Sequence, residues 1–115
     1  MGNKILKRAE KRSKQLAREI QKTEKAIDKL RAGSIKFKEK RRKELKKYSD
    51  DLFKCGVYSL DEITQMFFDA EKMAREERFQ NFTQPLWKHQ AYLDETKQDK
   101  EICDYYIQHH KEKDE

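Results

Sequence analysis

The feature that most constrains the fold is a row of apolar and small residues near the start of the chain, spaced by alternating steps of three and four. The row consists of Leu6, Ala9, Ser13, Leu16, Ile20, Thr23, Ile27 and Leu30. This spacing places all of these side chains on one face of an α-helix and is typical of a coiled-coil seam. Because Ala, Ser and Thr occupy part of the seam, we expect it to select a partner helix without holding it strongly.

Local signals predict where this first helix ends. The stretch Ala32–Ser34 contains Gly33, a residue common just after a helix, and Ser34, a residue common just before the next one. The sequence therefore predicts a long basic helix over residues 1–32 and a break or kink before residue 35.

A helical hairpin is predicted over residues 35–80, with its turn at residues 55–59. Gly56 is expected to end one helix and Ser59 to cap the next. Glu62 would complete a capping box with Ser59, and Tyr58 would pack on Ile63 as a hydrophobic staple. The hairpin should bury Ile63, Met66, Phe67, Ala70, Met73 and Ala74 against Leu45, Tyr48 and Leu52.

The last part of the chain is predicted to form a further helix or helices. The stretch 81–85 ends in Pro85 and is expected to interrupt the hairpin's second helix. Residues 84–110 contain two apolar patches separated by the polar stretch 94–101, and residues 111–115 should fray. The fold class is therefore all-α.

Composition restricts the size of any core and indicates macromolecular partners. Charged residues make up 43% of the chain, against about 25% in a typical domain. Residues 1–47 contain 19 Lys or Arg and 6 Asp or Glu, or +13, whereas residues 48–115 contain 9 and 16, or −7. Such an asymmetry predicts one surface for a polyanion and another for a neutral or basic partner.

The basic residues are the main candidates for function. They form two sets, and the second has eight Lys or Arg within twelve positions. The first set is Lys4, Lys7, Arg8, Lys11, Arg12, Lys14 and Arg18, and the second is Lys36, Lys38, Lys40, Arg41, Arg42, Lys43, Lys46 and Lys47. We expect them to contact nucleic-acid backbone without reading base sequence, although Lys-rich faces also serve only to keep helices solvated.

Aromatic residues exceed what a thin hairpin can bury, so some are expected on a protein-docking surface. The candidates are Phe68, Phe82, Trp87, Tyr92, Tyr105 and Tyr106. Trp and Tyr side chains dominate the binding energy of many protein interfaces.

Other kinds of chemistry lack a motif in this sequence. The spacing of Cys103, His109 and His110 fits no zinc site, and there is no Gly-rich phosphate loop. We therefore expect no metal, no cofactor, no small-molecule substrate and no enzymatic activity. Cys55 and Cys103 are expected to be free thiols in a cytoplasmic protein that does not enter membranes.

The leading functional hypothesis is an accessory or adaptor protein of a nucleoprotein complex. Its basic N-terminal half would bind DNA or RNA, and its acidic, aromatic C-terminal half would dock a protein. One alternative is a small regulator or inhibitor of the phage or plasmid type that acts through its helices on another protein. Another is a structural coiled-coil homodimer paired through the Leu6 to Leu30 seam. A basic helix lying on an anionic membrane ranks last, because the seam lacks bulky apolar residues.

Overall fold

The computed structural model describes residues 2–113, and the side chains of residues 4–111. It contains the α-helices α1 (Gly2–Cys55), α2 (Leu60–Arg78) and α3 (Gln84–Lys113), with a short π-helical turn, η1 (Phe79–Thr83), between α2 and α3. Within the described residues there is no strand. The predicted all-α class is confirmed.

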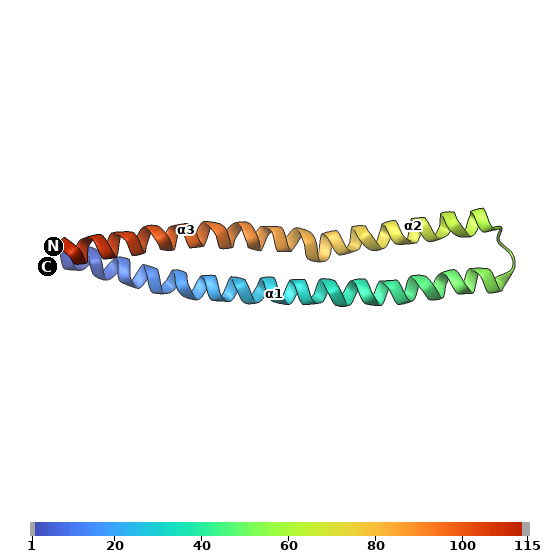
Figure 1. The fold of residues 1–115 in the computed structure, drawn as a ribbon, viewed down its shortest axis with the longest axis horizontal. Coiled ribbons are helices and arrows are strands. Elements are labelled where there is room, and N and C mark those ends of the chain that lie inside the picture. The colour runs from blue at the N-terminus through green and yellow to red at the C-terminus, as the bar shows by residue number, and fades with distance from the viewer. Residues whose placement is uncertain (1, 114–115) are drawn as a thin grey trace. The chain divides into compact units, whose positions relative to one another are not determined.

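The chain forms two compact units. Unit 1 combines Met1–Asp28 with Trp87–Glu115, and unit 2 consists of Lys29–Leu86. In each unit a part of α1 runs beside a later helix in the opposite direction, α3 in unit 1 and α2 in unit 2 (Figure 1). Each unit therefore pairs a segment of the basic N-terminal half with a later segment of the chain.

In unit 1 the seam of α1 faces α3. Every seam residue from Leu6 to Ile27 is buried or half-buried, and Leu16 is only 1% exposed. Ser13 Oγ donates to Asp104 Oδ1 at 2.5 Å, and Tyr92 Oη donates to Glu19 Oε2 at 3.0 Å. The seam is thus covered by the chain's own α3, so a homodimer through the seam would require α3 to be displaced.

A second seam, on α3, has the same spacing and was missed by the sequence analysis. It consists of His89, Leu93, Thr96, Lys100, Cys103, Ile107 and His110, all buried or half-buried. The stretch 94–101 is therefore part of a continuous helix, with Thr96 and Lys100 on its buried side. Thr96 is 4% exposed, and its hydroxyl donates to the Tyr92 carbonyl at 2.7 Å, which satisfies the buried polar group.

In unit 2, the predicted antiparallel hairpin and its turn are confirmed. α1 ends at Cys55, Gly56 has a φ of +68°, and α2 begins at Leu60. Ser59 caps α2 by accepting a hydrogen bond from the Glu62 N–H at 3.2 Å. The Glu62 carboxylate accepts from the Ser59 hydroxyl at 3.1 Å, which differs from the backbone bond of an ordinary capping box.

The predicted break at Ala32–Ser34 is wrong, because α1 continues through it. Gly33 instead gives space to an aromatic ring within unit 2. A Cβ at Gly33 would lie 2.8 Å from Cε1 of Phe82, closer than carbon atoms approach without repulsion. The glycine therefore serves helix packing, not helix termination.

The predicted interruption at residues 81–85 is also wrong, because η1 carries the helix into α3. Pro85 has no N–H, and in an α-helix its ring would clash with the carbonyl four residues earlier. In η1 the Gln84 N–H bonds to the Phe79 carbonyl, five residues back. This wider turn adds one residue just before Pro85 and so accommodates the proline without breaking the helix.

Two further expectations about the helices need correction. Met73 is 70% exposed, because Ala70 and Ala74 continue the buried side of α2 and leave Met73 on its flank. α3 extends through Lys113, beyond Lys111 where fraying was expected, and residues 114–115 lie outside the described part of the chain.

Candidate nucleic-acid interface

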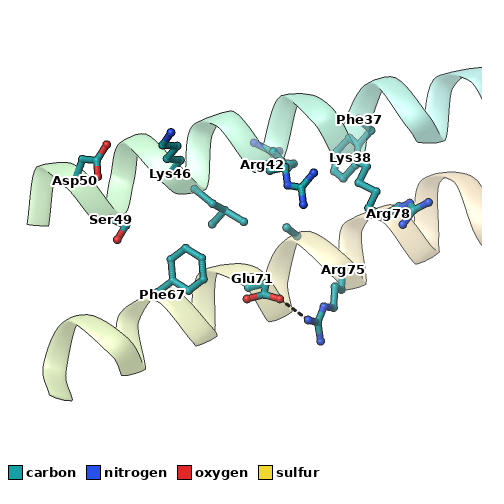
Figure 2. A pocket seen from close by; sticks show the side chains of 13 residues that line it. Phe37, Lys38, Arg42, Lys46, Ser49, Asp50, Phe67, Glu71, Arg75 and Arg78 are labelled. Atoms are coloured by element: carbon teal, nitrogen blue, oxygen red, sulfur yellow. Dashed lines mark hydrogen bonds and ion pairs between the residues drawn. The ribbon is translucent and has the colours of Figure 1, made fainter. Parts of the chain in front are cut away.

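Unit 2 has a groove of about 780 Å³ between α1 and α2 (Figure 2). It has six cationic side chains and two acidic ones. The lining residues are Phe37, Lys38, Arg41, Arg42, Leu45, Lys46, Ser49, Asp50, Phe67, Glu71, Ala74, Arg75 and Arg78. We call this feature the basic groove.

Helical spacing places three cations in a row along the α1 wall of the basic groove. Lys38, Arg42 and Lys46 follow one another at steps of four, so each lies about 6 Å further along the helix axis at 1.5 Å per residue. All three are exposed, and none makes a hydrogen bond or ion pair within the described residues. This row, called the cation row below, is therefore available to an anionic ligand.

The α2 wall carries Arg75 and Arg78, and both already have partners. Arg75 forms an ion pair with Glu71, and Arg78 Nε donates to Ser34 Oγ at 2.9 Å. Figure 2 shows the Arg75 side chain directed away from α1. These two arginines add positive charge along the rim, while the cation row supplies the unpaired groups.

The floor of the basic groove is apolar. It is formed by Phe37, Leu45, Phe67 and Ala74. The Phe37 ring packs against Phe82 with centroids 5.5 Å apart, and the guanidinium of Arg41 lies 5.1 Å from its centroid. Phe67 is half-buried and is directed from α2 towards α1 (Figure 2).

Arg41 is held by carboxylates and serves to join the helices of unit 2. Its guanidinium donates to Glu44 at 2.5 Å and to both oxygens of Glu77, at 2.9 and 3.0 Å. The hydrogen bonds that Arg41 donates to Glu44 and, second, to Glu77 raise the pKa of Arg41 above its usual range. Arg41 was predicted to contact nucleic acid, but its positive charge is already balanced by two acidic side chains.

The rest of the second basic set lies outside the basic groove. Lys36, Lys40, Lys43 and Lys47 are exposed on α1 but do not line it. The structure thus divides a run that looked uniform in sequence into groove-lining and outward-facing residues.

The first basic set belongs to unit 1. Lys4, Lys7, Arg8, Lys11, Arg12, Lys14 and Arg18 are all exposed on α1. Unit 1 pairs this segment with α3. Two ion pairs join lysines of α3 to glutamates of α1: Lys97 Nζ lies 3.7 Å from Glu24, and Lys111 Nζ lies 3.8 Å from Glu10. By charge, residues 1–28 and 87–115 contain 14 Lys or Arg and 12 Asp or Glu, or +2, whereas residues 29–86 contain 14 and 10, or +4.

The predicted docking aromatics are placed in different surroundings. Phe82 is half-buried against Phe37, and Tyr106 is half-buried with its ring edge-on to His110, centroids 3.9 Å apart. Tyr92 is 46% exposed and bonded to Glu19, while Phe68 is 61% exposed on α2.

The remaining docking candidates lie on one exposed face of α3. Trp87, Ala91, Ile102 and Tyr105 are exposed and lie opposite the seam at helical spacing, and Trp87 and Tyr105 are 60% and 72% exposed. The exposed acids Asp94, Glu95, Asp99 and Glu101 lie among them. We call this surface the outer face of α3, and the sequence analysis missed it because Ala91 and Ile102 were assigned to separate apolar patches.

Residues that could act as nucleophiles or metal ligands are scattered. Cys55 is exposed beside the hairpin turn and Cys103 is half-buried in unit 1, both as free thiols. Within the described residues, no three His, Cys, Asp or Glu side chains cluster as metal ligands would. The helices described here also include none with a stretch long and apolar enough to span a bilayer.

Comparison of the chain with protein-family models, curated proteins and solved structures gives no match to any of them.

Proposed function

We propose that this protein is a non-enzymatic accessory or adaptor protein of a nucleoprotein complex, which binds nucleic-acid backbone through the basic groove. The observation that carries the proposal is the cation row, Lys38, Arg42 and Lys46, which lines the groove without protein partners. Lys and Arg side chains that neutralise phosphates release counterions, and this release drives backbone binding independently of sequence.

The protein-docking part of the proposal rests on the outer face of α3. Trp87 and Tyr105 are the kinds of side chain that anchor interfaces, and their acidic neighbours favour a basic partner. The unpaired thiols of Cys55 and Cys103 are consistent with the cytoplasmic location that we propose.

A titration of salt dependence tests the nucleic-acid part. Fluorescence anisotropy would follow binding of the full chain to a labelled oligonucleotide from about 50 to about 200 mM salt. The triple variant K38A/R42A/K46A removes the cation row, and K36A/K40A/K43A removes the same charge from exposed residues outside the basic groove. Circular dichroism would show that both variants remain folded.

We expect the cation-row variant to bind at least about ten-fold more weakly than the unmodified chain. The slope of log affinity against log salt concentration should become less steep by about 2 to 3, at about 0.7 to 0.9 for each lost phosphate contact. The control variant should lose much less. Equal losses in both variants would mean that diffuse charge, not the groove, binds the ligand. Affinity no tighter than about 100 µM for the unmodified chain would overturn the nucleic-acid function altogether.

A second candidate function is that of a regulator that acts on another protein. It is favoured by the outer face of α3, because a protein could bind this face in the absence of nucleic acid. For this candidate, the unmodified chain should form a stoichiometric complex with its protein partner and bind oligonucleotides only weakly, and the variant W87A/Y105A should lose the protein complex.

A further inference from the structure

The floor of the basic groove identifies the form of nucleic acid that fits it. Backbone binding to a duplex needs cations but no apolar surface, because the bases of a duplex are stacked inside it. The groove combines the cation row with Phe37, Leu45 and Phe67 beneath it. Proteins that bind single strands use this combination, a positive groove that follows the backbone and aromatic rings on which bases stack.

Phe67 is the ring placed to receive a base. It stands between α1 and α2 in Figure 2, and no other aromatic ring packs against it within the described residues. Phe37 differs, because its ring packs against the ring of Phe82 and also contacts the guanidinium of Arg41. Of the two half-buried rings that line the groove, Phe67 is therefore the one without an aromatic or cationic contact in the described residues.

The position of Phe67 also favours a single strand. The bases of a duplex are stacked inside it, so a duplex would meet the exposed cations of the groove and leave the half-buried Phe67 without a base to stack on. An extended single strand can enter, and the step of about 6 Å along the cation row resembles the distance between successive phosphates of such a strand.

We propose that the basic groove of unit 2 binds single-stranded DNA or RNA, with phosphates on Lys38, Arg42 and Lys46 and a base stacked on Phe67. This inference rests on the proposed function and specifies its ligand. The rim charges Arg75 and Arg78 add attraction for the strand. Glu71 disfavours a phosphate path along α2, and Asp50 ends the cation row on α1, four residues beyond Lys46.

The test compares single-stranded and duplex probes on matched variants. The probes are a fluorescein-labelled oligothymidylate of about 16 nucleotides, an oligouridylate of the same length, and a duplex of the same length. F67L removes the aromatic ring but retains an apolar side chain of similar volume. F68L makes the same change at the neighbouring residue, which is 61% exposed and does not line the groove.

We expect the single strands to bind more tightly than the duplex at equal salt. F67L should weaken single-strand binding by about ten-fold, since stacking contributes about 1 to 3 kcal/mol per base, and should leave duplex binding unchanged. F68L should alter neither. As a direct measure, an oligonucleotide containing 5-bromouracil should photo-crosslink to the peptide that contains Phe67 in the unmodified protein.

The failure of this inference and that of the proposed function are distinguishable. If duplex and single strand bind equally and F67L affects neither, the groove binds backbone only and the single-strand inference is overturned. If no oligonucleotide binds, the proposed function itself is overturned. If an acidic amphipathic Glu/Leu peptide displaces the oligonucleotide, binds more tightly than it does, and is weakened by F67L, the groove is a protein-binding site and the inference is also overturned.

Discussion

Gly33 of α1 and Phe82 of η1 are fitted to each other: a Cβ at position 33 would lie 2.8 Å from the Phe82 ring. Both residues belong to unit 2, and both lie where local sequence signals indicated that a helix should stop. The ring occupies the space that a larger residue would fill, so a residue that weakens an isolated helix permits close packing here.

This fit predicts a change of sign in a double-mutant cycle. In the unmodified protein, Gly33→Ala should lower the free energy of unfolding by about 1 kcal/mol. Overpacking destabilises by about 1 to 3 kcal/mol, and the better helix propensity of Ala stabilises by about 1 kcal/mol. In the background Phe82→Ala, the same substitution should raise it by about 1 kcal/mol. Urea denaturation measures both values, and the same sign in both backgrounds would show that the ring does not occupy this space.

The cap of α2 predicts a defined loss of stability. Ser59→Ala removes the acceptor of the Glu62 N–H and should cost about 1 kcal/mol in urea denaturation. Ser59→Asn retains a capping side chain and should stay within a few tenths of a kcal/mol of the original. Equal losses for the two variants would indicate that the Ser59 hydroxyl acts through its bond to the Glu62 carboxylate instead.

The pairing of the α1 seam with α3 predicts that Leu16 is the most sensitive apolar residue of unit 1. Leu16 is 1% exposed, and Leu16→Ala should cost about 3 kcal/mol and speed amide exchange in α3. Ile5, on the same helix, is 53% exposed, so Ile5→Ala should cost no more than about 0.5 kcal/mol. Comparable costs for the two variants would contradict the packing of the seam on α3.

The bonds of Asp104 predict a pH dependence for unit 1. Its carboxylate accepts from Lys100 Nζ at 2.6 Å and from Ser13 Oγ at 2.5 Å, and these bonds, the first more strongly, hold its pKa below the ordinary 3.8. Because the folded state binds the proton less readily than the unfolded state, ionised Asp104 stabilises the fold above about pH 3.8. This contribution disappears as the pH falls through the lowered pKa.

The measurement is thermal unfolding between about pH 6 and about pH 2. Asp104→Asn should reduce the loss of Tm on acidification, because the variant has no carboxyl group to protonate at this position. Asp99→Asn, at an exposed site of α3 with no bonded partner in the described residues, should leave the acid-dependent loss unchanged. A steeper or equal loss for Asp104→Asn would show that the bonds to Lys100 and Ser13 do not stabilise the folded state.

Several features of the fold were predictable because they depend on residues close together in the chain. The seam from Leu6 to Leu30 is a helical pattern, and Ser59 caps the helix that starts at the next residue. The all-α class and the hairpin turn follow from such local rules. The concentration of cations in residues 36–47 was likewise visible, although which of them line the basic groove was not.

The features that only the tertiary structure decided depend on residues far apart in the chain. Gly33 and Pro85 favour helix ends by local criteria, yet Phe82 packs on the first and the π-helical turn η1 accommodates the second. Polar residues such as Thr96 and Lys100 did not mark a seam until α1 covered them in unit 1. The basic groove exists because the antiparallel hairpin of unit 2 sets Phe67 of α2 beside the cation row of α1. The sequence alone thus determined the all-α class, the seam of the first helix and the hairpin turn. Contacts between distant residues decided the continuity of the helices, the buried face of α3, the pairing and the candidate binding site, because packing energy exceeds the small local preferences of single residues.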